Sequence, residues 1–163
     1  MKPQGLNTYE IVDESTCIVF TTKGEKFLIS PSCIELIKER TWSILGGRYA
    51  QTRVKNKRVL LHNFLIPHDS GYIVDHINGN SLDYRLENLR VVKPKENRYN
   101  LKQYKNCKLF RGVSFNKRNK RYVARIQKDN KPIFLGSFKR LDEAIKARVK
   151  AEKKYFKEFR RYE

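Results

Sequence analysis

Residues 73–92 read IVDHINGNSLDYRLENLRVV, and this stretch decides how the middle of the chain folds. Two β-branched apolar residues precede Asp75 and His76, a pattern typical of a short strand. Asn78-Gly79-Asn80 is a strong turn signal that ends this strand. Apolar side chains then alternate with charged ones as far as Val92, so we expect a loop and a second strand.

Pro94 follows this second strand and suits the first turn of a helix, because its fixed φ and missing N–H are tolerated there. We therefore expect a helix over residues 94–101. The order predicted for residues 73–101 is strand, loop, strand, helix.

The polar residues of this segment fit phosphodiester hydrolysis, which needs a base and a cation. Neighbouring side chains on a strand point to opposite sides, so Asp75 can hold a cation while His76 faces a water molecule. Asn97, on the expected helix, can supply a second oxygen donor for a hard cation such as Mg²⁺. Asn88 can bond neighbouring backbone groups and fix the loop beside the histidine.

The spacing of these residues is characteristic. Residues 60–66 read LLHNFLI, and the following pattern is Asp75-His76-x-x-Gly79-x-x-x-Asp83-x-Arg85-x-x-Asn88-Leu89-Arg90, then Glu96-Asn97-x-x-Asn100. The pattern resembles the HNH motif in the form found in phage and intron-encoded homing endonucleases. The resemblance covers residues 60–104 and implies a ββα-metal fold.

The resemblance also implies roles for single residues. His76 would be the general base, Asp75 and Asn97 the ligands of one divalent cation, and Asn88 the structural residue of the catalytic motif. The third letter of the motif is often His; Asn at position 97 favours Mg²⁺ or Mn²⁺ over Zn²⁺ or Ni²⁺. Asn100, one turn further along, is the alternative ligand.

Other polar residues of the middle segment are assigned as follows. We expect His62 and His68, which have no partner at ligand spacing, to be structural or solvated. Arg90 and Arg98 are candidates for neutralising DNA phosphates. Arg85 can do the same or form an internal ion pair with Asp83 or Glu87.

The N-terminal segment shows no catalytic spacing. It predicts a hairpin over residues 16–29, a short helix over 33–38 and a second hairpin over 48–61 that turns at Lys55-Asn56-Lys57. We expect this region to serve as a platform or to add DNA contacts.

The C-terminal segment predicts strands over residues 110–115, 121–127 and 132–136, followed by a helix from Leu141. Its sequence resembles the DNA-binding domain of plant ethylene-response factors over residues 109–158, which implies that the sheet lies in the major groove. Alternation turns Tyr122, Ala124 and Ile126 toward the helix. The candidates for DNA contact are Arg111, Lys117, Arg118, Lys120, Arg121, Arg125 and Phe134. Position 125 is usually acidic in the plant domains, and Phe134 stands where they carry Trp.

The charge is unevenly distributed. The 163 residues include 36 Lys and Arg against 17 Asp and Glu, a formal net charge of +19, of which residues 1–60 carry +4, residues 61–104 +1 and residues 105–163 +14. This asymmetry indicates a module for a polyanion, nucleic acid before an anionic membrane surface, joined to a part with another task.

The composition also excludes several classes of protein. The start does not resemble a signal peptide, no run of 18 apolar residues occurs, and the three cysteines (Cys17, Cys33 and Cys107) are scattered. We expect a reduced protein of the cytoplasm of a bacterial or phage-infected cell, neither secreted nor membrane-spanning.

Together these observations predict an α+β protein with a small N-terminal α+β region (1–59), a central ββα-metal module (60–104) and a C-terminal three-stranded antiparallel sheet with one packed helix (105–163). The expected function is that of a metal-dependent DNA endonuclease of the homing type. As a monomer with Mg²⁺ or Mn²⁺, it would nick one strand of duplex DNA per binding event and leave 5′-phosphate and 3′-hydroxyl ends. Two alternatives are a non-catalytic, sequence-specific regulator on a decayed nuclease fold and a packaging or ribosomal protein held by charge alone.

Overall fold

The computed structural model describes residues 6–100 and 109–157. The fold is α+β, as the sequence predicts, and the chain divides into two compact units, Met1–Asn97 and Arg98–Glu163. In the described residues, no helix combines the length and apolar character needed to cross a membrane.

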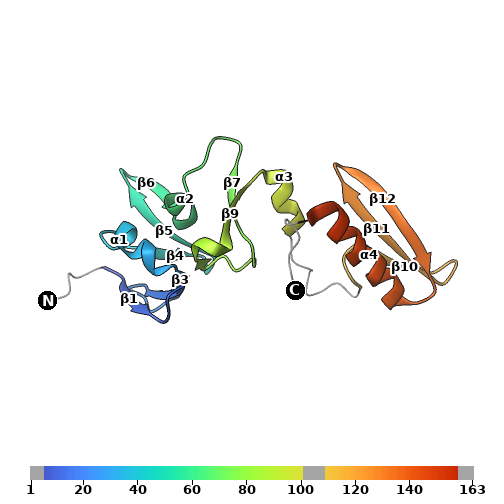
Figure 1. Cartoon of the computed structure of the whole chain (residues 1–163), viewed down its shortest axis with the longest axis horizontal. Coiled ribbons are helices and arrows are strands. Elements are labelled where there is room, and N and C mark those ends of the chain that lie inside the picture. Colours follow the sequence, from blue (N-terminus) through green and yellow to red (C-terminus); the bar gives the residue numbers. More distant parts are fainter. Residues whose placement is uncertain (1–5, 101–108, 158–163) are drawn as a thin grey trace. The chain divides into compact units, whose positions relative to one another are not determined.

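The first unit is built from short strands and single helical turns (Figure 1). Its strands are β1 (Thr8–Ile11), β2 (Cys17–Phe20), β3 (Lys26–Ile29), β4 (Ser43–Leu45), β5 (Tyr49–Val54), β6 (Lys57–Leu60), β7 (Ile73–His76), β8 (Asp83–Tyr84) and β9 (Leu89–Val92). Its helical turns are η1 (Pro31–Cys33), α1 (Ile34–Ile37), α2 (Leu61–Leu65), η2 (Leu86–Asn88) and α3 (Pro94–Asn97).

Three sheets share one core in this unit. The strand orders are β1-β2-β3-β8, β4-β5-β6 and β7-β9. The two predicted hairpins are present as β2–β3 and β5–β6, and the second turns at Lys55 and Asn56, both with positive φ. The fully buried Trp42 and Tyr84 belong to the common core. Because β3 pairs in parallel with β8, the N-terminal segment and the HNH-like segment form a single unit.

The helix predicted over residues 94–101 is shorter than expected. Only Pro94–Asn97 is α-helical, and a 3-10 turn, η3 (Arg98–Asn100), follows at the start of the second unit. Residue 101 lies outside the described residues. The strand–loop–strand–helix order over residues 73–97 is otherwise confirmed.

The second unit is a three-stranded antiparallel sheet with one helix, as predicted. Its elements are β10 (Val113–Asn116), β11 (Arg121–Lys128), β12 (Lys131–Phe138) and α4 (Leu141–Phe156). Helix α4 lies along one face of the sheet (Figure 1), and Tyr122, Ala124 and Ile126 point into the cores on that face.

Arg148 on α4 occupies a core position of the second unit. It is 3% exposed, its Nη1 lies 3.1 Å from Glu152 Oε1, and its Nε donates to the Arg111 carbonyl at 3.2 Å. Gly112, with φ of +77°, leaves the room that this guanidinium needs, because a Cβ there would overlap Arg148 and the Arg125 carbonyl.

Candidate active site

Asp75 and His76 lie at the end of β7, which pairs antiparallel with β9. Val74 and His76 lie on one face of this two-stranded ribbon, and Asp75 lies on the other, as alternation requires. The two side chains therefore have separate surroundings. Both residues are nearly buried, with exposed fractions of 7% for Asp75 and 6% for His76.

The carboxylate of Asp75 is held by Arg90. The two residues are direct partners in the β7–β9 register, so their side chains lie on one face. Arg90 Nη2 lies 2.8 Å from Asp75 Oδ2, and Arg90 Nε donates to the same oxygen at 3.0 Å. Arg90, expected to neutralise a DNA phosphate, instead compensates this nearly buried carboxylate.

Asn88 holds the turn that follows His76. Its Oδ1 accepts from the backbone N–H of Asn78 at 2.9 Å, and its Nδ2 donates to the carbonyl of Asp83 at 2.8 Å. Its own carbonyl accepts from the N–H of Ile77 at 2.8 Å. One buried amide therefore ties both ends of residues 77–83, as the sequence predicted for a loop-fixing asparagine.

Asp83 is the charged centre of the same loop. Arg85 binds it through Nε–Oδ1 at 2.9 Å and Nη2–Oδ2 at 2.8 Å, and Asn78 Nδ2 donates to Oδ2 at 2.8 Å. Burial alone would raise the pKa of Asp83, but the hydrogen bonds from Arg85 and Asn78 outweigh it and hold this pKa below its usual value. Arg85 also pairs with Glu87 at 3.2 Å, so of its two expected roles the internal ion pair is observed.

His76 packs into an aromatic cluster. Its ring centroid lies 5.2 Å from that of Tyr84 and 5.4 Å from that of His62, both edge to face, and 6.3 Å from that of Tyr49. Burial lowers the pKa of His76 to about 4, although the nearby charge of Asp83 opposes this. The imidazole is therefore neutral at pH 7, as a general base must be, but it is more enclosed than an imidazole open to a DNA backbone.

His62 and Tyr84 complete this cluster. From the sequence, His62 was expected to be structural or solvated, and Tyr84 was not singled out. His62, on α2, is 7% exposed and stacks on Tyr84 with centroids 6.2 Å apart. Burial, with a contribution from His76, lowers the pKa of His62 to about 4. The Tyr84 hydroxyl accepts from the N–H of Ala50 at 2.6 Å. The contact with His76 could not be found from spacing, because it joins residues from different sheets.

The two cation ligands predicted from the sequence, Asp75 and Asn97, are both oxygen donors. Asn97 is half-buried at the end of α3, and within the described residues no hydrogen bond engages its side-chain amide. The described ranges contain no group of three or more His, Cys, Asp or Glu side chains arranged for a metal. One carboxylate and one amide suit Mg²⁺, which keeps several waters and binds substrate phosphates rather than a full protein cage.

In the second unit, several candidates for DNA contact are exposed. Arg125 and Phe134 are cross-strand partners on the face of the sheet away from α4, and Phe134 is 62% exposed. Lys117, Arg118 and Lys120 are exposed on the β10–β11 turn, as is Arg98 in η3.

Two arginines of the second unit are less accessible. Arg121 Nη2 donates to the Ser137 carbonyl at 2.7 Å, and its Nε donates to Ser137 Oγ at 3.2 Å, so its guanidinium braces the sheet. Arg111 is half-buried, beside the N-terminal end of β10.

Comparisons with known proteins agree with this geometry. Residues 64–99 match the family model described as HNH endonuclease. Protein 3.8 of Escherichia phage T7 is 38% identical over 66 residues, which are 40% of this chain and 54% of that protein, so the chain spans about half the length of this curated relative. No solved structure matches the chain significantly. Asp75, His76, Asn88 and Asn97 all lie in the matched range, and residues 64–99 form an HNH endonuclease domain.

Proposed function

We propose that this protein is a metal-dependent DNA endonuclease of the homing type, which nicks one strand at a recognised duplex site in a bacterial or phage-infected cell. The observation that carries the proposal is the arrangement at the end of β7. Asp75 and His76 diverge there, and the loop beside them is fixed by Asn88, inside the range that matches the HNH endonuclease family.

The chain's own residues have distinct tasks in this proposal. His76, neutral at pH 7, takes the proton of the attacking water. Because His76 is only 6% exposed, its surroundings must open when DNA binds. Arg90 orients Asp75, and Asn88 keeps the His76 backbone in place. Asp75 and Asn97 would hold the divalent cation, Mg²⁺ or Mn²⁺, which supplies charge stabilisation at the phosphate and the leaving 3′ oxygen.

The second unit is proposed to dock on duplex DNA. Its exposed sheet face carries Arg125 and Phe134, and the turn at Lys117–Lys120 adds cations for phosphates. The expected product ends are 5′-phosphate and 3′-hydroxyl, and one active site per monomer implies one nick per binding event.

Plasmid nicking in Mg²⁺ tests the function. Wild type and His68→Ala are expected to relax supercoiled plasmid equally, because the partly exposed His68 lies outside the cluster around His76. His76→Ala is expected to bind DNA without nicking it. Equal nicking by His76→Ala and wild type would reject the assignment. If all three proteins bind DNA and none of them nicks it, a regulator on a nuclease fold is favoured.

A further inference from the structure

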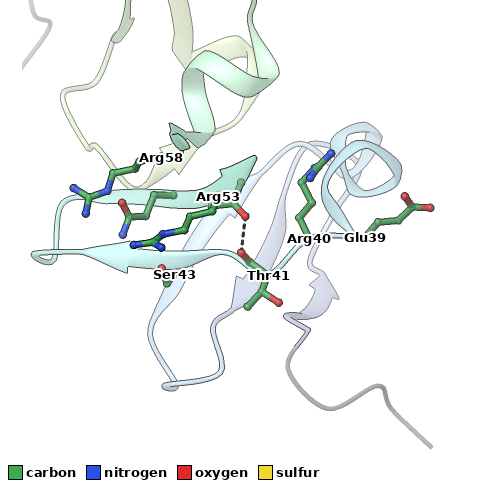
Figure 2. A pocket seen from close by; sticks show the side chains of 8 residues that line it. Glu39, Arg40, Thr41, Ser43, Arg53 and Arg58 are labelled. Carbon is green, nitrogen blue, oxygen red and sulfur yellow. Dashed lines mark hydrogen bonds between the residues drawn. The ribbon is translucent and has the colours of Figure 1, made fainter. Parts of the chain in front are cut away.

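A polar hollow of about 490 Å³ lies in the first unit, beside the β5–β6 hairpin and the loop after α1 (Figure 2). We call it the basic groove; its lining residues are Glu39, Arg40, Thr41, Ser43, Gln51, Thr52, Arg53 and Arg58. Every one of them is polar or charged, with three arginines against one glutamate. Pockets for small organic ligands are lined mainly by apolar side chains, so this lining indicates a different kind of ligand.

Arg53 and Arg58 give the basic groove an uncompensated charge. They are directly opposite each other in the β5–β6 register, a placement that is unfavourable for like charges. Within the described residues, neither guanidinium takes part in an ion pair or a hydrogen bond. Figure 2 shows both side chains extending to the same side, with the Glu39 carboxylate pointing away from them. An anion bound between them would relieve this repulsion.

The walls of the basic groove are fixed by the fold. Thr52 Oγ1 donates to the Thr41 carbonyl at 2.9 Å, which ties the loop after α1 to β5. The Arg40 guanidinium lies over the ring of Phe64, 5.6 Å from its centroid. The groove thus presents cations and short hydroxyl and amide donors on a braced surface, the side-chain types that contact DNA phosphates.

The position of the basic groove relates it to the candidate active site. By strand alternation, Tyr49 and Arg53 lie on the same face of β5, and the Tyr49 ring lies 5.5 Å from that of His62 and 6.3 Å from that of His76. Four residues of strand separate them, which is about 14 Å at roughly 3.4 Å per residue. A duplex whose backbone reaches the candidate active site can therefore place nearby phosphates of the same backbone in the basic groove.

We propose that the basic groove binds phosphodiester groups of the duplex DNA backbone, a few nucleotides to one side of the cleaved bond. The inference rests on the proposed nuclease function for the location of that bond. It assigns the N-terminal segment a direct part in positioning the substrate, separate from the sheet of the second unit.

Paired charge variants of the full chain test the proposal. One double variant carries Arg53→Gln and Arg58→Gln. The control double variant carries Lys55→Gln and Lys57→Gln, which removes the same charge from the same hairpin but not from the groove lining. If the arginine variant loses two phosphate contacts, the slope of the logarithm of its DNA association constant against the logarithm of salt concentration becomes shallower by about 1.8. Its DNA affinity at about 0.15 M salt then falls roughly thirtyfold. The lysine pair is expected to change affinity less than about threefold. Equal slopes and affinities for the two double variants would overturn the proposal.

Two controls separate this result from other causes. Removing the opposed arginines should leave the thermal unfolding midpoint of the protein unchanged or higher, because a repulsive pair is lost. Nicking by wild type is measured in parallel under the same conditions. If wild type does not nick at all, the nuclease proposal fails. The salt slopes still show whether the basic groove binds DNA phosphates.

The identity and place of the anion are tested with modified substrates. Single methylphosphonates are placed in turn at the positions on either side of the mapped nick. On one side, at least one of them should weaken binding by wild type but not by the arginine variant. If the arginine variant loses affinity for single-stranded RNA but keeps its affinity for duplex DNA, the assignment to DNA is contradicted. Inorganic phosphate, exchanged for chloride at constant ionic strength, should compete with DNA more strongly for wild type than for the variant. Phosphate binding that needs the two arginines but does not displace DNA would assign the groove to a free anion instead.

Discussion

Arg90 and Asp75 face each other across the β7–β9 ribbon, and Arg90 Nη2 and Nε lie 2.8 and 3.0 Å from the same carboxylate oxygen. The Asp75 side chain is 9% exposed and that of Arg90 15%. A carboxylate this enclosed is tolerated because the guanidinium compensates its charge. The pair also fixes the direction of Asp75 on the face of β7 away from His76.

Arg90→Ala is expected to destabilise the first unit by about 3 kcal/mol, because it leaves the Asp75 carboxylate nearly buried without its guanidinium. Urea unfolding measures the change. Arg140→Ala is the control: its ion pair with Asp142 has side chains 73% and 47% exposed, and breaking it should change the free energy of unfolding far less, because solvent screens the pair. Similar costs for both variants would show that the Asp75–Arg90 pair contributes little.

Asn88→Ala is expected to cost about 2 kcal/mol and to slow nicking while leaving DNA affinity unchanged. The substitution leaves the Asn78 N–H and the Asp83 carbonyl without their partner, and the loop beside His76 loses its tie. Asn63→Ala, at an exposed position of α2, should stay within about 0.5 kcal/mol of wild type. A fully active Asn88→Ala protein would argue against a positioning role for this amide.

The buried imidazoles of His62 and His76 make the first unit less stable in acid. Each has a pKa of about 4 instead of 6.5, mainly through burial. Between about pH 6.5 and pH 4 the unfolded chain binds protons that the folded chain does not, so the free energy of unfolding falls as the pH falls and this loss ends below about pH 4. A pKa difference of about 2.5 corresponds to roughly 3 kcal/mol for one imidazole.

Urea titrations in chelator at several pH values test this dependence. His62→Gln removes one of the two titrating groups, so the decline in stability with falling pH should be shallower than in wild type. A decline of unchanged steepness in His62→Gln would show that His62 is not held neutral by the fold.

Arg125→Ala is expected to weaken binding to the specific duplex by about 1–3 kcal/mol, with relaxed base preference at one position, if its guanidinium reads a base edge. Lys146→Ala removes the same charge from the exposed face of α4 and should weaken binding to specific and random DNA alike. Competition between the two DNAs at fixed salt makes the comparison. If both variants lose the same affinity for specific and for random DNA, the sheet face away from α4 does not read the base sequence.

The sequence predicted the elements near the site well because their signals are local. Turn residues at 78–80 and β-branched runs on either side define β7 and β9, and alternation separates Asp75 from His76. The same rules predicted the three strands and helix of the second unit and the inward residues of β11. These features depend on neighbours within a few positions, which a sequence displays directly.

The features that the sequence did not predict depend on tertiary contacts. The parallel pairing of β3 with β8 joins segments over fifty residues apart, and it places Tyr84 in the core. The cluster of His62, His76, Tyr84 and Tyr49 draws on three sheets and α2, so its burial and lowered pKa values follow only from packing. The intramolecular contacts of Arg90 and Arg121 were not predicted for the same reason. Their partners, Asp75 and Ser137, lie on neighbouring strands.

The role of the His76 imidazole is measured by single-turnover cleavage of a mapped duplex by His76→Ala, beside equilibrium binding of the same DNA. A general base contributes about 10²–10⁴ in rate, so we predict a rate lower by at least about a hundredfold with binding unchanged. Cleavage by His76→Ala at the wild-type rate would show that the imidazole at the end of β7 does not perform the proton transfer.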